Sequence, residues 1–398
     1  MSSRDLVVFG EDWASHPSST QHLMRCLGEQ YRIIWVNSIG LRRPRFAVQD
    51  MRRVIHKVAG MFAKRAAPSA NSAMPADFRV VQPRALSWPG SRLAATFNQR
   101  VLGQQLREVM AEMGMQNPIV WTSLPSAVDV LDALNPHAVV YYCGDDFSAL
   151  AGVDHLPVAA QEARLVARAD LVLAASQTLA QRFPVEKTWC LPHGVDFAHF
   201  ADKTLPRPAD LPRGKPIAGF YGGLNNWLDQ QLLREVAQQL ADWNIVLIGP
   251  QQCDISALLS EPNVHYLGGK SHAELAAYVQ HWQVSLLPFV DNAQIRACNP
   301  LKLREYLATG KPLVSTPFPA VLEYRGVVHL ADSAEHFAQA IVTAAIDAPA
   351  LGAAWLSHID DWCSVRSLAK LGEQRQSSVA QESWQHRAAL VHGLMTAL

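Results

Sequence analysis

Short apolar runs alternate with longer helical patterns along most of the 398-residue chain, and this alternation limits the fold more than any other feature. In the first part of the chain, the runs that indicate buried strands are 5–10, 32–37, 119–121, 138–143 and 171–174. Helical patterns lie between them at 18–30, 96–114, 124–134 and 159–169. Strands that alternate with helices favour a parallel sheet with helices on both faces.

This rhythm is interrupted by a polar segment, 201–216, which contains Pro206, Pro208, Pro212, Gly214 and Pro216. Such a composition is typical of a linker. The strand runs then resume at 217–221, 245–249, 264–267, 284–288 and 312–315, with helical patterns at 228–242, 272–281 and 301–308. Beyond residue 350 the pattern is helical, over 351–371 and 382–398.

We therefore predict an α/β protein with two Rossmann-like domains. The first covers 1–200 and the second 217–374, with the linker 201–216 between them and a tail helix over 375–398. Ligands of such folds bind outside the carboxyl ends of the strands. The expected ligand site is a cleft in which the strand ends of the two domains face each other.

The overall charge is balanced, with 35 Lys plus Arg against 35 Asp plus Glu. This balance argues against a protein covered in basic charge for nucleic acid, and against an acidic solvating tail. Hydrophobic residues make up 49% of the chain, which is enough for large cores and too much for a disordered protein.

Cysteine usage and the N-terminal residues indicate a cytoplasmic protein. The six cysteines are scattered without a C-x-x-C pair, which is typical of reduced core residues. No His, Cys and acidic residues show metal-ligand spacing, so we expect no metal. The apolar run 6–9 is too short for a signal peptide, and no run approaches the roughly 18 residues needed to span a bilayer.

One segment, 42–65, departs from the balanced charge. It holds eight basic residues against Asp50, a local sum of +7 (8 − 1): Arg42, Arg43, Arg45, Arg52, Arg53, Lys57, Lys64 and Arg65. Apolar residues recur on one helical face at Met51, Val54, Ile55, Val58 and Phe62. One interpretation is a helix that lies in an anionic membrane interface and brings the protein to a lipid-linked acceptor through Arg42, Arg43, Arg52, Arg53 and Lys57. The other is a core-packed helix with a solvated basic face; no recognition motif supports nucleic acid.

The second half carries a recognisable motif. From Pro300 to Val314 the chain follows the pattern P-x-K-x-x-E-Y-x-A-x-G-x-P-x-V, and 193–196 reads H-G-V-D. This text resembles the donor half of GT-B glycosyltransferases, where that pattern holds the nucleotide-sugar. The segments 9–13 and 16–20 resemble a bacterial subgroup that makes surface polysaccharides, the teichuronic-acid-type transferases. The resemblance implies a GT-B fold whose C-terminal tail crosses back to the first domain.

The physical interpretation of the motif is an anion site. Pro300 suits the first turn of a helix, and a helix N-terminus attracts a diphosphate. Lys302 lies in that turn, and Glu305, one turn later, can accept the hydroxyls of a ribose. The alternative is an ordinary amphipathic helix in which Lys302 and Glu305 form a surface pair.

Further donor contacts follow from glycine turns and from the resemblance. Gly222 and Gly223 follow one strand and Gly249 the next, where a backbone without side chains can approach a phosphate, although plain turns use glycine too. The predicted donor-binding residues are Gly222, Gly223, Gly249, Asn299, Leu301, Lys302, Glu305, His193 and Arg296. Many retaining members of the family carry a glutamate eight positions before the second one, and here Ala297 occupies that position.

Candidates for the chemistry lie in the first half. Asp145 and Asp146 follow the strand 138–143, and one of them could act as the catalytic base. The resemblance favours Asp145 for this role, and Asp146 is expected to cap the following helix. After the first strand, Glu11, Asp12 and His16 are further catalytic or acceptor-site candidates. The alternative is that these residues only cap and pack against the neighbouring helix.

We therefore expect a metal-independent hexosyltransferase at the inner face of a bacterial cytoplasmic membrane. Its substrates would be a nucleotide diphosphate sugar and a lipid-linked oligosaccharide of a surface polysaccharide or exopolysaccharide, with no cofactor and no nucleic acid. Two alternatives belong to other classes. One is a sugar-nucleotide epimerase of the same double-Rossmann plan, and the other is a non-catalytic protein that binds nucleotides or sugars between two lobes.

Overall fold

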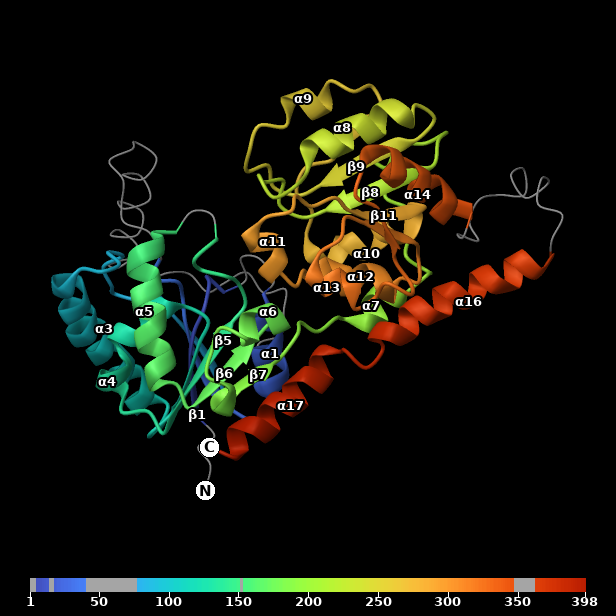
Figure 1. Cartoon of the computed structure of the whole chain (residues 1–398). Coiled ribbons are helices and arrows are strands. Elements are labelled where there is room, and N and C mark those ends of the chain that lie inside the picture. Colours follow the sequence, from blue (N-terminus) through green and yellow to red (C-terminus); the bar gives the residue numbers. More distant parts are fainter. Residues whose placement is uncertain (1–4, 14–17, 41–76, 151–152, 347–361) are drawn as a thin grey trace. The chain divides into compact units, whose positions relative to one another are not determined.

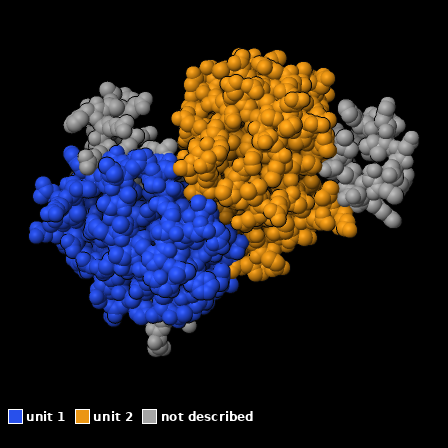
Figure 2. Space-filling view, in the orientation of Figure 1, with its two compact units in different colours: residues 1–192, 387–398 blue, residues 193–386 orange. Residues whose placement is uncertain are grey.

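The computed structural model describes residues 5–13, 18–40, 77–150, 153–346 and 362–398. The chain forms two compact units (Figure 2). Unit 1 comprises Met1–Pro192 with Arg387–Leu398, and unit 2 comprises His193–His386. The predicted residues His16, Arg42, Arg43, Arg52, Arg53 and Lys57 lie outside the described residues.

Unit 1 contains a seven-stranded parallel sheet of order β3-β2-β1-β4-β5-β6-β7. Figure 1 labels β1, β5, β6 and β7 of this sheet. The strands are β1 Asp5–Phe9, β2 Arg32–Val36, β3 Phe78–Val81, β4 Ile119–Thr122, β5 Ala138–Cys143, β6 Leu171–Ala174 and β7 Thr188–Cys190. β1, β4, β5 and β6 are buried along their whole length, as expected for parallel strands covered on both faces. The strand order reverses between β1 and β4, which is the position where such sheets bind ligands.

The helices of unit 1 begin at polar caps. In α1, Ser19–Leu27, the side chain of Ser18 accepts the N–H of Gln21, and in α3, Arg92–Glu112, Ser91 accepts the N–H of Ala94. The remaining helical elements are η1 Pro125–Asp129, α4 Leu131–Leu134, α5 His155–Arg168, α6 Gln177–Ala180 and η2 Val185–Lys187.

Unit 2 contains a six-stranded parallel sheet of order β10-β9-β8-β11-β12-β13. Its strands are β8 Ile217–Tyr221, β9 Asn244–Ile248, β10 Val264–Tyr266, β11 Val284–Leu287, β12 Leu313–Ser315 and β13 His329–Leu330. The helices are α7 Phe197–Ala201, α8 Gln230–Gln239, α9 Ser256–Leu259, α10 His272–His281, α11 Ala293–Ala297, α12 Leu301–Ala308, α13 Pro319–Leu322, α14 Ala334–Ile346 and α16 Trp362–Val379. The prediction of two Rossmann-like α/β halves is therefore confirmed.

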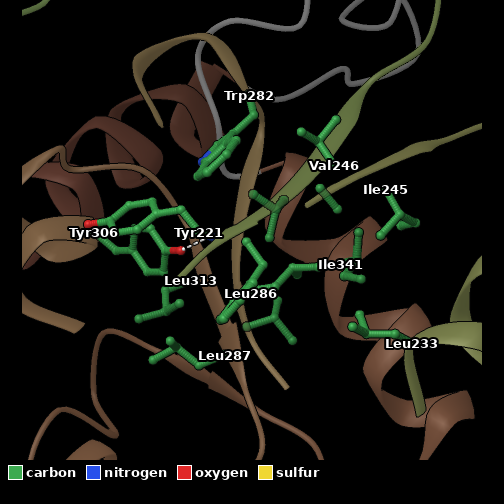
Figure 3. Packing of buried hydrophobic residues seen from close by; sticks show 14 of the residues in the cluster. Tyr221, Leu233, Ile245, Val246, Trp282, Leu286, Leu287, Tyr306, Leu313 and Ile341 are labelled. Carbon is green, nitrogen blue, oxygen red and sulfur yellow. Dashed lines mark hydrogen bonds between the residues drawn. The ribbon is translucent and has the colours of Figure 1, made fainter. Parts of the chain in front are cut away.

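Aromatic rings pack closely against the centre of the unit 2 sheet. Figure 3 shows Tyr221, Trp282 and Tyr306 together, apart from the aliphatic cluster around Ile341. The ring centroids of Tyr221 and Tyr306 lie 4.8 Å apart. Gly219 of β8 makes this packing possible, because a Cβ at that position would lie 2.0 Å from the Trp282 ring.

The C-terminal tail returns to unit 1, as the resemblance implies. Its last helix, α17 Trp384–Thr396, lies mostly in unit 1. There, the hydroxyl of Tyr31 lies 2.9 Å from Nδ1 of His392. No helix in the described ranges has both the length and the apolar character that a bilayer-spanning segment requires.

The segment 201–216 is attached to unit 2 throughout. Arg207 donates to the carbonyl oxygens of Pro212 (2.8 Å) and His281 (3.2 Å). In return, Nε2 of His281 lies 2.8 Å from the carbonyl oxygen of Leu205. The chain passes from unit 1 to unit 2 earlier, between Pro192 and His193.

Candidate functional site

Three glycine turns meet at the carboxyl edge of the unit 2 sheet, beside the reversal of strand order between β8 and β11. Gly222, Gly249 and Gly268 follow β8, β9 and β10, with φ angles of 144°, 140° and 70°. The N–H of Gly222 donates to Ile248 (2.8 Å), and a Cβ on Gly249 would lie 1.9 Å from the carbonyl oxygen of Gly222. Only glycine allows these backbones to approach so closely in the left-handed region.

Lys302, in the first turn of α12, places its amine at these turns. A Cβ on Gly222 would lie 2.6 Å from Nζ of Lys302. The same Nζ lies 5.1 Å from the ring centroids of Phe220 and Trp227 and 5.5 Å from that of Phe289. Burial lowers the pKa of Lys302. The negative charge of Glu305 opposes this effect, and the aromatic rings surround an amine that can bind an anion in its protonated form.

Glu305 is buried one turn further along α12 and holds the same edge together. Its carboxylate accepts a hydrogen bond from the hydroxyl of Tyr221, and its Oε1 lies 2.6 Å from Nε2 of His272. The hydroxyl of Tyr306 in turn accepts the N–H of Tyr221 at 2.9 Å. The α12 helix is therefore joined to the end of β8 and the start of α10. The sequence around His272 predicts only that this residue begins a helix, and it does not predict the contact with Glu305.

Arg304 anchors the opposite side of α12. It is 1% exposed, and its Nη1 donates to Oδ1 of Asn299 at 2.6 Å. Its Nε donates to Glu382, whose carboxylate also accepts the hydroxyl of Tyr324 at 3.0 Å. A fully buried arginine is rare unless it is paired, and the sequence contains no signal for a partner 78 positions away.

The other predicted donor residues have varied surroundings. Leu301 and His193 are half-buried, and the turn after His193 has no room for a side chain, because a Cβ on Gly194 would lie 2.7 Å from the Trp384 ring. Arg296 is exposed and forms a bidentate pair with Asp291, at 2.6 and 2.7 Å. The structure thus brings Gly222, Gly223, Gly249, Lys302 and Glu305 to one edge, whereas Arg296 lies on the surface of unit 2.

Three carboxyl groups follow strands at the carboxyl edge of the unit 1 sheet. Burial raises the pKa of Glu11, and the negative charges of Asp145 and Asp12 raise it further, against an opposing hydrogen bond from Gln21 (3.4 Å). Partial desolvation likewise raises the pKa of Asp145, with a contribution from Asp146, although the residue keeps an exposed surface. Oδ1 of Asp12 accepts the N–H of Ser38 at 3.2 Å. Groups that influence each other in this way are candidates for proton transfer.

Asp146 has a different environment from its neighbour Asp145. Its Oδ1 accepts the N–H and the hydroxyl of Ser148, at 2.9 and 2.6 Å, and also the guanidinium of Arg182. Burial opposes its ionisation, but these hydrogen bonds and the charge of Arg182 outweigh that effect and lower the pKa of Asp146. A carboxylate held in this way stabilises the turn and is a poorer candidate for proton transfer than Asp145.

The described residues contain no group of three His, Cys, Asp or Glu side chains placed to hold a metal ion. At the unit 2 edge, positive charge comes from Lys302, from the N-terminus of α12 and from backbone amides of the glycine turns. Ala297, at the end of α11, is buried and presents a methyl group rather than a carboxylate.

Comparison with known proteins gives a consistent result. Residues 215–347 match the family model described as glycosyl transferases group 1. Over 221 residues, 50% of this chain, the chain is 29% identical to the teichuronic acid biosynthesis glycosyltransferase TuaH of Bacillus subtilis. The match spans 56% of that relative, or a little over half its length.

Solved structures share the fold across both units. Sucrose-phosphate synthase of Thermosynechococcus elongatus matches with a TM-score of 0.68 and 16% identity, over 99% of this chain and 98% of its own. Anabaena HepE, solved with UDP-glucose, matches with a TM-score of 0.66 and 13% identity, over 99% of this chain and 100% of its own. At these identities the likeness concerns the fold, and both unit 1 and unit 2 are included in it.

Proposed function

We propose that this chain is a group 1 glycosyltransferase of the GT-B fold, which transfers a sugar from a nucleotide diphosphate sugar to a glycan acceptor. The observation that carries the proposal is the cation of Lys302 beside the Gly222 turn, at the N-terminus of α12. A diphosphate suits this combination of a fixed positive charge, a helix dipole and close-packed backbone.

The donor nucleotide occupies the carboxyl edge of the unit 2 sheet. Its diphosphate lies against Lys302, Gly222 and Gly223, and its ribose hydroxyls lie near Glu305. UDP is the first nucleotide to test, because HepE, which shares the fold, was solved with UDP-glucose. Arg296, Asn299, Leu301 and His193 remain predicted donor contacts.

The reaction forms a bond between an acceptor oxygen and the anomeric carbon of the sugar. The bond from that carbon to the diphosphate oxygen breaks, and the nucleoside diphosphate leaves with the electron pair. Lys302 stabilises the charge that develops on the leaving group. Asp145 takes the proton of the acceptor hydroxyl, and its raised pKa makes it a stronger base than an ordinary aspartate. Glu11, Asp12 and His16 bind the acceptor.

The acceptor is a lipid-linked oligosaccharide of a surface polysaccharide, at the inner face of the cytoplasmic membrane. The similarity to TuaH supports polysaccharide synthesis as the pathway class. The basic segment supports an anionic membrane as the partner, through Arg42, Arg43, Arg52, Arg53 and Lys57.

Calorimetric titration with UDP and with a panel of nucleotide-sugars tests the donor site. Lys302→Met should weaken binding at least about tenfold, because a charged hydrogen bond contributes roughly 1.5–3 kcal/mol. The matched control is Lys215→Met, an exposed lysine that precedes β8 at the other edge of the same sheet. Equal affinities for the two variants contradict the proposal. An epimerase would convert the free nucleotide-sugar without an acceptor, which product analysis detects.

A further inference from the structure

The segment before α3 and the first turns of that helix present four large apolar side chains to solvent. Leu86 is 47% exposed, Trp88 54%, Leu93 85% and Phe97 37%. All four lie within twelve positions of one another, and Leu93 and Phe97 share one helix face at i and i+4. A cluster of this kind on a soluble unit marks an interaction surface.

Amide side chains of α3, the buried Asn98 and the half-buried Gln105, hold this segment in place. Asn98 accepts the N–H of Leu86 at 2.7 Å and donates to its carbonyl oxygen at 3.0 Å. Gln105 accepts the N–H of Arg84 at 2.9 Å and donates to the carbonyl oxygen of Gln82 at 2.9 Å. With its backbone fixed against α3, the segment turns Arg84, Leu86 and Trp88 outward.

The inner face of α3 is already packed against the rest of unit 1. A Cβ on Gly103 would lie 2.5 Å from the Cβ of Ala133, so α3 and α4 are in close contact there. Arg107 donates to the carbonyl oxygen of Ala133 at 2.9 Å, and Leu102 and Leu106 are fully buried. The exposed side chains therefore cannot turn into the core without breaking this packing.

The charged residues in this part of the chain are all basic. Residues 84–100 include three arginines and no Asp or Glu: Arg84, Arg92 and Arg100. Arg84, Arg92 and Arg100 are exposed, as are the four apolar side chains of the same part of the chain. Arginine with tryptophan, leucine and phenylalanine is the composition that binds the interface of an anionic bilayer.

We propose that the surface formed by Arg84, Leu86, Trp88, Arg92, Leu93, Phe97 and Arg100, the α3 surface, docks the protein on an anionic lipid bilayer. Trp88, Leu93 and Phe97 enter the interface, and the arginines bind lipid phosphates. A second copy of the chain fits this surface poorly, because an isologous contact would bring the same arginines together. The inference rests on the proposed function in supplying a lipid-linked acceptor, and it adds residues 84–100 to the basic residues of 42–57 that the proposed function already names.

Sedimentation with vesicles of phosphatidylcholine and phosphatidylglycerol tests the inference. The double variant Leu93→Ser/Phe97→Ser should lose at least tenfold in vesicle partition coefficient. The matched control is Leu156→Ser/Trp189→Ser, which removes two other exposed apolar residues of unit 1, at 87% and 52% exposure. The control should partition like the unchanged protein.

Two results overturn the inference. One is equal partition of the Leu93→Ser/Phe97→Ser variant and the unchanged protein, as expected if 42–57 carries all the binding. The other is self-association of the unchanged protein without vesicle binding. UDP titration of the same variants separates this inference from the proposed function. If vesicle partition is lost while UDP affinity is intact, the result supports docking alone. If vesicle partition is intact and no variant binds UDP, the result contradicts the proposed transferase instead.

Discussion

Glu382 accepts a hydrogen bond from the buried guanidinium of Arg304, while its backbone carbonyl accepts the N–H of Val195 at 2.9 Å. Val195 and Ser383 also form a parallel bridge. Val195 lies just after the chain first enters unit 2, and Ser383 just before it leaves. Through Arg304, the helix that carries Lys302 is thus anchored both where the chain enters unit 2 and where it leaves unit 2.

Arg304→Met should destabilise unit 2 by about 3 kcal/mol, because it removes the guanidinium that pairs with the partly buried carboxylate of Glu382. Urea denaturation followed by intrinsic fluorescence measures this loss. Arg234→Met is the matched control, since Arg234 pairs with Glu261 at 2.8 Å but is half exposed, and such pairs contribute about 0–1 kcal/mol. Similar losses of stability for both variants would show that the Arg304–Glu382 pair contributes no more than an exposed ion pair.

Gly219→Ala should destabilise the protein by about 2 kcal/mol or more, because the new methyl group overlaps the Trp282 ring. Gly326→Ala is the control, with no atom within 4 Å of the added Cβ. The midpoint of urea denaturation should fall for the first variant and stay close to the original for the second. An unchanged midpoint for Gly219→Ala would show that the Trp282 ring can move aside.

The strands that the sequence predicts best are those buried on both faces. The runs 138–143, 171–174 and 217–221 match β5, β6 and β8 residue for residue, because parallel central strands are continuously apolar. β3 and β7 escape prediction, since they lie at the sheet edges and place polar or exposed residues such as Arg79 and Trp189 among the apolar ones.

The residues of the candidate site are likewise predictable only in part from the sequence. Lys302 and Glu305 are three positions apart on one helix, so the sequence alone places them together. The partners that surround them, Trp227, His272 and Tyr221, come from distant elements, and no local pattern announces contacts of that range. Proline content predicts a linker at 201–216, whereas the hydrogen bonds that attach it to α10 depend on tertiary structure.

Lys311 should make the stability of unit 2 depend on pH. Burial lowers its pKa from 10.5 to about 8, and the charge of Lys203 adds to this. Between those two values the unfolded chain holds a proton that the folded chain has released, so stability rises with pH through this window. Lys311 accounts for a rise in the free energy of unfolding of about 3 kcal/mol at most, at 1.36 kcal/mol per pKa unit.

Urea denaturation from pH ~7 to pH ~10.5 measures this effect as the difference between the unchanged protein and Lys311→Met. The variant should be more stable at the low end, with the difference closing as the pH rises. Lys215→Met, which removes an exposed lysine, should leave the slope unchanged. Parallel curves for Lys311→Met and the unchanged protein would mean that the buried amine is well solvated.

Asp145→Asn should lower turnover by about 10²–10⁴-fold while UDP affinity changes little, because an amide cannot take the acceptor proton. The raised pKa of Asp145 also predicts that turnover falls with acid at a higher pH than an ordinary aspartate, at 3.8, would produce. Nucleotide release from a nucleotide-sugar in the presence of acceptor measures both quantities. Asp132→Asn, which alters an exposed acid paired with Arg168, is the control for turnover. If Asp145→Asn retains near-normal turnover and Glu11→Gln does not, the base is Glu11, whose raised pKa suits the same role.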